Sequence, residues 1–174
     1  MPPMHSGFVG FVVAAAITAA MGANELREPL RPLEFLVGSC WTGTFPDGKS
    51  TDTHCFESVF DGHFVRDRHH VRGASKPYAG EAIYGWDAKR KKVVYTYWAS
   101  DGALSTGEMI LGAAGELIFP EAYAADGGEM TLKNVWTRRG PEAYDVWVAR
   151  RTDGEWRELW RMTLRREQGS VNPR

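Results

Sequence analysis

Five Asp-Gly dipeptides divide most of this chain into short segments of similar length. They lie at residues 47–48, 61–62, 101–102, 126–127 and 153–154. Asp-Gly is typical of tight β-hairpin turns because both residues tolerate the positive φ angles that such turns need. Aromatic and β-branched residues flank most of these dipeptides, and further turn signals lie near residues 87–91, 112–115 and 139–142. The spacing predicts an all-β fold, an antiparallel up-and-down β-barrel of about ten strands between Ser39 and Arg166.

The first Asp-Gly turn predicts a disulfide. If residues 47–48 form a two-residue loop, Trp41 lies opposite His54, and Cys40 lies opposite Cys55, the only other cysteine. Directly opposed residues have Cβ atoms ~4.5–5.5 Å apart, which is close to the separation that a disulfide needs. We therefore expect a cross-strand Cys40–Cys55 disulfide in an exported protein. Two free thiols in a cytosolic protein are the alternative.

Two other hairpins receive a register from the same rule. The turn at 61–62 places His54 opposite His69. The turn at 153–154 places Trp147 opposite Trp160 and Ala149 opposite Glu158. Because side chains alternate between the two faces of a strand, these pairs fall on one face, which is rich in aromatic residues and which we assign to the interior.

A closed barrel of more than eight strands leaves space inside for a ligand. A lining of aromatic side chains with a few polar groups is typical of a small-molecule site. We therefore predict an interior site for a small hydrophobic or aromatic molecule, with these candidate residues: Trp41, His54, Asp67, His69, Trp98, Trp136, Trp147, Glu158 and Trp160.

The N-terminal stretch differs from the rest of the chain. Residues 8–21 are apolar and rich in small side chains, and no Asp, Glu, Lys or Arg precedes Glu25. The stretch is too short to span a bilayer of ~30 Å comfortably. It predicts a signal peptide over residues 1–23, cleaved near 20–23, and a periplasmic or secreted protein with no membrane segment after cleavage. An uncleaved anchor or a wrongly assigned start codon is the alternative.

Length and composition fit one globular domain after the signal peptide. We expect a leading segment over 24–38 with a short helical turn, or else an entry strand, at 33–37, the barrel domain over 39–166, and a flexible C-terminal tail over 167–174. The formal net charge of −1 comes from 21 basic and 22 acidic residues mixed along the chain, so no nucleic-acid partner is predicted. The basic run at 89–92 is typical of a solvated hairpin tip. The oligomeric state is not predicted.

Four stretches give the chain a family resemblance: LEFLVGSCW, FDGHFVRD, GEAIYGWDAKRKKVVYTYWASDG and EWRELWRMTLRR. With these the chain resembles the bacterial domain-of-unknown-function family 1579, of the lipocalin-like or calycin type, over about residues 31–166. The resemblance implies a barrel that begins with a Gly-x-Trp element, whose Trp plugs the base and stacks under a late Arg. Here Gly38 and Trp41 are separated by one extra residue, and Arg165 is the candidate partner of Trp41.

Haem-binding nitrobindins are a neighbouring barrel type, and they use a histidine of the last strand as the iron ligand. This chain has no histidine after His70. We therefore predict no haem, unless His54, His63 or His69 replaces that ligand from another wall, and we predict no other cofactor.

Two groups of residues are candidates for chemistry. His54 and His69 are expected to be cross-strand neighbours, with Asp67 on the same side. Two histidines and one carboxylate are a known metal-ligand set, but interior histidines are more often hydrogen-bonded to a carboxylate or an indole, so we predict no metal. Glu158, between two tryptophans, is the other candidate for acid/base work, with an interior ion pair or a wet rim position as the alternative.

Three functions are compatible with these features. Binding of a small hydrophobic or aromatic molecule is the leading prediction, and an enzymatic activity is not predicted. The first alternative is a barrel enzyme that uses Glu158, or the group of His54, Asp67 and His69, for acid/base chemistry. The second alternative is a barrel with a filled core that acts through contacts with a partner.

Overall fold

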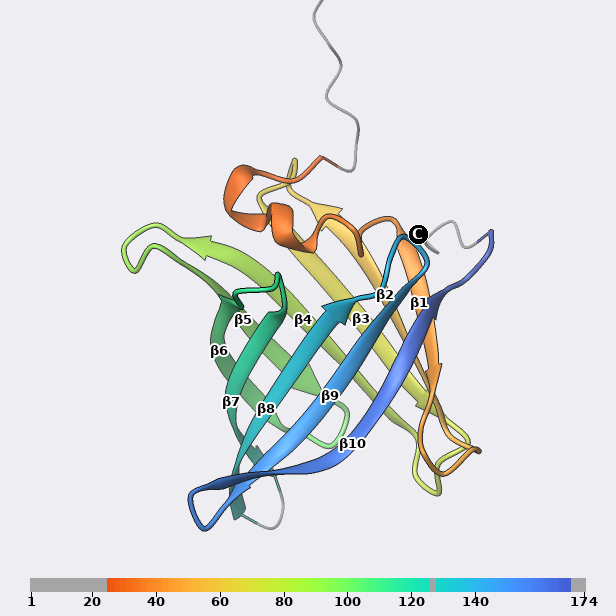
Figure 1. Ribbon diagram of the computed structural model, residues 1–174. Coiled ribbons are helices and arrows are strands. Elements are labelled where there is room, and N and C mark those ends of the chain that lie inside the picture. The colour runs from red at the N-terminus through yellow and green to blue at the C-terminus, as the bar shows by residue number, and fades with distance from the viewer. Residues whose placement is uncertain (1–24, 126–127, 170–174) are drawn as a thin grey trace, which may run out of the picture.

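Every strand of this chain pairs with its neighbours in sequence, and the first strand closes the sheet by pairing with the last. The computed structural model describes residues 25–125 and 128–169. Within those residues, ten antiparallel strands form one closed barrel (Figure 1). The predicted all-β barrel of about ten strands is therefore confirmed.

The strands follow one another with short connections. Their bounds are β1 Ser39–Thr44, β2 Thr51–Val59, β3 Phe64–Arg72, β4 Tyr78–Asp87, β5 Lys92–Ala99, β6 Leu104–Leu111, β7 Leu117–Ala125, β8 Gly128–Arg138, β9 Ala143–Thr152 and β10 Glu155–Arg166.

The Asp-Gly turns set the register of the first two hairpins as predicted. In the β2–β3 connection, Asp61 and Gly62 have φ angles of 54° and 78°, the conformation that two-residue hairpin loops favour. Trp41 is opposite His54, and His54 is opposite His69. The Cys40–Cys55 disulfide between β1 and β2 is present, which confirms that prediction. The turn expected at 126–127 lies outside the described residues.

The register predicted for the β9–β10 hairpin is correct near the turn and wrong beyond it. Glu158 is opposite Ala149, as expected. A bulge between Glu158 and Trp160 then shifts the pairing, so Trp160 is opposite Val148 and Trp147 is opposite Arg161. One extra residue in a strand turns every later side chain to the other face.

A short 3₁₀ helix, η1 (Glu28–Leu33), covers the end of the barrel that lies at the top of Figure 1. Its Leu30 and Leu33 are buried in the core. The helix begins at Glu28, with Pro29 in its first turn, where proline is tolerated. Residues 33–37 continue from it as a turn, in which the N–H groups of Leu36 and Val37 donate to the carbonyls of Leu33 and Glu34.

Trp41 belongs to this closed end. Its side chain is fully buried, and its indole N–H donates to the Leu36 carbonyl at 3.0 Å. The guanidinium of Arg166 lies 4.6 Å from the ring centroid of Trp41. The predicted partner, Arg165, is wrong by one position, since β1 pairs Trp41 with Arg166 and Thr42 with Arg165.

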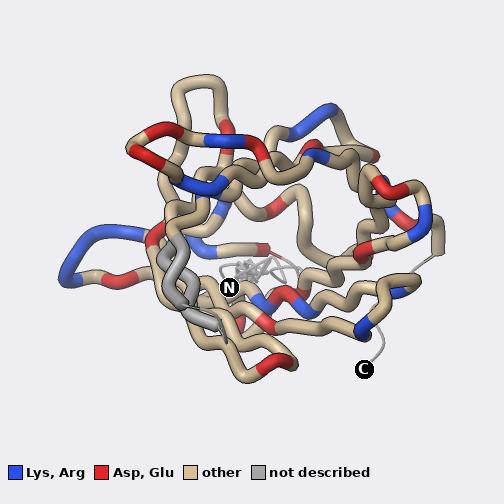
Figure 2. The backbone as a smooth tube through the Cα atoms, turned by 90° about the horizontal axis from the view of Figure 1, so that it is seen from below, with Lys and Arg blue, Asp and Glu red and all other residues tan. Residues whose placement is uncertain are grey.

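The exterior of the barrel carries both acidic and basic residues. Seen from below in Figure 2, acidic and basic residues are distributed around the ring of strands. The basic run at 89–92 lies in and beside the β4–β5 connection, which projects from the barrel (Figure 1). In the described part of the chain, no helix is long and apolar enough to cross a membrane. The predicted signal peptide, and the tail beyond residue 169, lie outside the described residues.

Candidate functional site

A cavity of about 410 Å³ occupies the barrel interior, away from the end that η1 covers. Strands from all sides of the barrel line it. The lining is rich in aromatic side chains, which come from five strands and the β1–β2 connection: Phe45, Tyr78, Tyr84, Tyr95, Tyr97, Phe119, Trp136 and Trp160. A cavity of this size and lining suits a small molecule with a flat apolar body.

One side of the cavity is polar, and its side chains form a continuous chain of hydrogen bonds. His54 Nδ1 lies 2.8 Å from Asp67 Oδ2, and His54 Nε2 lies 3.2 Å from Asp52 Oδ2. His69 Nδ1 lies 3.1 Å from Asp52 Oδ1, and His69 Nε2 lies 2.9 Å from the hydroxyl of Tyr97. The chain therefore runs from Asp67 through both imidazoles and Asp52 to Tyr97 on β5.

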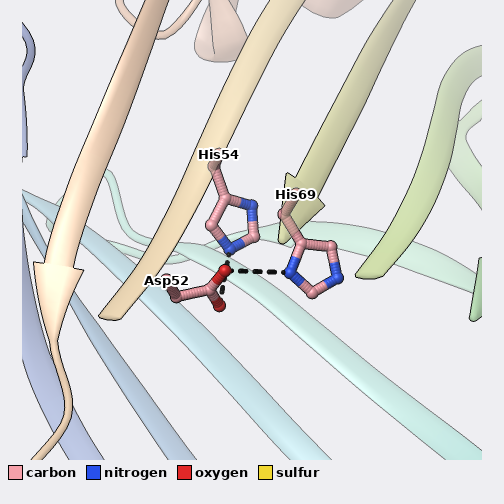
Figure 3. A group of neighbouring side chains, drawn as sticks. All are labelled: Asp52, His54 and His69. Atoms are coloured by element: carbon pink, nitrogen blue, oxygen red, sulfur yellow. Dashed lines mark hydrogen bonds and ion pairs between the residues drawn. The ribbon is translucent and has the colours of Figure 1, made fainter. Parts of the chain in front are cut away.

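Strand periodicity brings these groups together. Asp52 and His54 are two residues apart on β2, so both point inward, and the same spacing places Asp67 and His69 inward on β3. The register sets His54 opposite His69, with ring centroids 4.6 Å apart and ring planes within 12° of parallel. Figure 3 shows both rings directed at the Asp52 carboxylate.

A glycine makes room for the end of this chain. Gly80 on β4 is opposite His69. A Cβ atom at this position would lie 2.6 Å from His69 Nε2 and 2.5 Å from Tyr97 Cε2. Real Cβ contacts are much longer, so the hydrogen bond between His69 and Tyr97 requires glycine here.

The charges of this polar side depend on one another. Burial opposes a charge on His54, but the carboxylates of Asp67 and Asp52 outweigh it and raise the pKa of His54 to about 10. Burial also opposes the charge of Asp52, and its contacts with the two histidines more than compensate, so the pKa of Asp52 is lowered. At neutral pH, an imidazolium therefore lies between two carboxylates.

The position of one further proton follows from this state. Asp52 is ionised and can only accept, so His69 Nδ1 carries the proton that points toward it. The other ring nitrogen, His69 Nε2, lies 2.9 Å from the hydroxyl of Tyr97. The Tyr97 hydroxyl in turn lies 2.6 Å from the hydroxyl of Tyr78, which extends the chain of hydrogen bonds by one residue.

The same carboxylates act on a tyrosine of the closed end. Tyr144 is fully buried against Trp41, with ring centroids 5.3 Å apart. Burial and the negative charges of Asp67 and Asp52 raise the pKa of Tyr144 well above its usual value. This phenol is therefore neutral at physiological pH and takes no part in charge balance.

Five of the nine predicted site residues line the cavity, and one more closes the barrel. Trp41 lies in the core at the closed end, where it packs against Tyr144. The residues that line the cavity are His54, Asp67, His69, Trp136 and Trp160.

The inward orientation predicted for the other three is wrong. Trp98 is 46% exposed on the outside of β5. The bulge in β10 leaves Trp147 and Glu158 on the outer face, where the indole N–H of Trp147 donates to Glu158 at 2.7 Å. Arg161 also contacts Glu158, at 3.2 Å. The Glu158 side chain is 48% exposed, so it does not reach an interior ligand.

Sequence reasoning missed Asp52, Tyr97 and Tyr78. Asp52 carried a usable signal, because it lies two residues before His54 and therefore shares its face. Tyr97 and Tyr78 become part of the site only through the pairing of β3 with β4 and of β4 with β5, which no local pattern specifies.

Comparison of the chain with models of protein families gives no match, and a search of curated proteins gives no significant match. The assignment of function therefore depends on the geometry of the cavity.

Proposed function

We propose that this protein is exported and binds a small hydrophobic or aromatic molecule inside its barrel. The observation that carries the proposal is the cavity of about 410 Å³, which is walled by aromatic rings and has one polar side. This volume supports an interior ligand and disfavours a filled core. The disulfide supports a periplasmic or secreted location, because disulfides persist in oxidising compartments. The resemblance to the domain-of-unknown-function family 1579 remains a prediction consistent with this barrel.

The polar side favours a particular charge on the ligand. Asp52 and Asp67 line the cavity, and among the described residues no lysine or arginine does. A buried carboxylate on the ligand would find no cation to pair with, because His54 already lies between both aspartates. The ligand is therefore uncharged or cationic where it meets the polar side, and the aromatic rings accept either a flat apolar body or a cation.

A matched series of probes tests this proposal. We suggest isothermal titration calorimetry with 2-naphthol, 2-naphthylmethylamine and 2-naphthoate in the presence of a chelator. The three probes share a bicyclic ring and differ in charge. We expect the alcohol and the amine to bind, and the carboxylate to bind at least about tenfold more weakly, a difference of about 1.4 kcal/mol.

The possible outcomes test the existence of the binding site and its charge preference separately. Equal or tighter binding of 2-naphthoate would refute the charge argument and leave the binding site standing. No binding of any probe, together with no retained small molecule in native mass spectrometry of unrefolded protein, would refute the proposed function.

A second candidate function is acid/base catalysis on such a ligand. The unbroken chain of hydrogen bonds from Asp67 to Tyr97 favours it, because such a chain can move a proton along the cavity wall. Glu158 has no part in this candidate, since it lies outside the barrel. If a turnover is found, His69→Gln should abolish it, and His70→Gln, on the outer face of β3, should not.

A further inference from the structure

Two histidine nitrogens and one carboxylate converge at one point of the cavity wall. One ring nitrogen of each histidine and one carboxylate oxygen of Asp52 all lie within 4.8 Å of one another. His54 Nε2 lies 3.2 Å from Asp52 Oδ2, and His69 Nδ1 lies 3.1 Å from Asp52 Oδ1. Donors bound to one ion at about 2.0–2.1 Å lie roughly 2.8–3.4 Å apart, for octahedral or tetrahedral angles. Each histidine nitrogen therefore already lies at such a distance from one oxygen of the carboxylate.

The orientation of both rings also fits metal binding. Figure 3 shows that the two ring nitrogens face the same carboxylate from β2 and β3. The rings stack within 12° of parallel with centroids 4.6 Å apart, and dashed lines in Figure 3 join one nitrogen of each ring to the Asp52 carboxylate, so both nitrogens border the space at this carboxylate. A small retreat of the Asp52 carboxylate would make room for an ion there.

The far nitrogen of each ring already has an oxygen partner. His54 Nδ1 lies 2.8 Å from Asp67, and His69 Nε2 lies 2.9 Å from the hydroxyl of Tyr97. Histidine ligands almost always donate their second N–H to a carboxylate, carbonyl or water, which fixes the ring and its tautomer. Asp67 and Tyr97 supply this second set of contacts from opposite sides of the site.

The burial and the charges of these side chains also favour a bound cation. The side chains of Asp52, His54, Asp67 and His69 are 6%, 14%, 4% and 10% exposed, so solvent does little to screen their charges. Two carboxylates held this closely require a positive charge between them. A divalent ion supplies that charge and, unlike a proton, can also bind a group in the cavity.

We propose that Asp52, His54 and His69 bind one divalent first-row transition-metal ion, with Asp67 and Tyr97 orienting the two histidines. The remaining coordination positions face the aromatic cavity, where a ligand or water can occupy them. A set of two imidazoles and one carboxylate suits zinc, iron(II) or cobalt(II), whereas calcium and magnesium prefer oxygen donors alone. The sequence predicted no metal because interior histidines are more often hydrogen-bonded to a carboxylate or an indole, and the carboxylate it placed beside them was Asp67. The proposal does not depend on the proposed organic ligand.

The test uses the protein without a polyhistidine tag, stripped by a chelator that is then removed. Calorimetric titration with zinc chloride should give one bound ion per chain, and magnesium chloride should give none. Cobalt chloride should produce visible absorption bands that zinc then abolishes. In the double variant His54→Gln/His69→Gln the zinc site and the cobalt bands should be lost.

Matched controls separate this site from other histidines and from misfolding. The double variant His63→Gln/His70→Gln removes the same number of histidines outside the cavity and should bind zinc as the wild type does. Tyr97→Phe preserves the ring and removes only an outer partner, so it should weaken zinc binding by about 10–100-fold. Wild-type binding no stronger than that of His54→Gln/His69→Gln, or an unchanged zinc affinity in Tyr97→Phe, would overturn the proposal.

These results are independent of the test of the proposed function. The naphthalene probes are measured in the presence of a chelator, so that a failure of zinc binding leaves their outcome unchanged. Binding of zinc without binding of any probe would support the metal site and refute only the organic ligand.

Discussion

His54 is the residue on which the charge balance of the barrel interior depends. It contacts Asp67 at 2.8 Å and Asp52 at 3.2 Å, and all three side chains are almost fully withdrawn from solvent. A buried ion pair is not in itself a large source of stability, but removal of one partner leaves the other charge without compensation. Here a single residue compensates two carboxylates.

We therefore predict that His54→Gln destabilises the metal-free protein by about 3–5 kcal/mol. Urea unfolding in the presence of a chelator measures this change. His70→Gln is the control, because His70 is a neighbour of the site on the outer face of β3 and should change stability by less than about 0.5 kcal/mol. Equal losses in the two variants would contradict the charge balance described for His54.

The raised pKa of His54 also predicts how the stability of the protein depends on pH. The folded-state pKa of His54 is about 10, against 6.5 in the unfolded chain. A group whose pKa rises on folding stabilises fully below its unfolded pKa, and this contribution is lost as pH rises through the folded value. The melting temperature of the wild type should therefore decrease between pH 6.5 and pH 10 relative to that of His54→Gln.

At the scale of the elements, strand β4 positions the polar side of the cavity through a residue with no side chain. Gly80 lies beneath the hydrogen bond between His69 of β3 and Tyr97 of β5. Gly85, on the same strand, would instead direct a Cβ to 2.6 Å from the ring of Phe64. Phe64 is 39% exposed and can rotate away, whereas His69 and Tyr97 are held by their partners.

We predict that Gly80→Ala destabilises the metal-free protein by about 1–3 kcal/mol, as is typical of overpacked interiors, and that Gly85→Ala costs clearly less. Urea unfolding of both variants against the wild type gives the comparison. A Gly80→Ala variant as stable as the wild type would show that the contact between His69 and Tyr97 does not need this glycine.

The strands also show what local sequence can and cannot specify. Asp-Gly turns predicted the pairing of His54 with His69, because an uninterrupted hairpin keeps its register from turn to end. They failed for Trp147 and Trp160, because the bulge in β10 adds a residue that no turn signal records. Tyr97 of β5 reaches the site across β4, and the turn signals of single hairpins do not specify a contact between strands that are not neighbours.

At the scale of the whole molecule, the barrel separates its stable end from its hollow end. The helix η1, Trp41 and Arg166 fill one end, and the disulfide joins β1 to β2 close to them. The cavity lies beyond this core, with Trp136 in contact with both regions. A ring added to the apolar part of the cavity lining should therefore affect binding more than folding.

Val148 offers a test of this separation. Its side chain is 5% exposed and lines the cavity opposite Trp160, so that a larger side chain would occupy space reserved for a ligand. We predict that Val148→Phe weakens the binding of 2-naphthol at least about tenfold. Because the added ring enters a cavity, the free energy of unfolding should change by less than about 1.5 kcal/mol.

Val135→Phe is the matched control for Val148→Phe. Val135 is opposite Trp147, on the outer face of the barrel, so the same substitution there adds a ring outside the cavity. We expect it to leave the affinity for 2-naphthol unchanged in calorimetric titration. If Val148→Phe binds as the wild type does, the ligand does not occupy this cavity. If both variants lose binding equally, the effect comes from the barrel wall as a whole, and the division into a stable end and a hollow end is wrong.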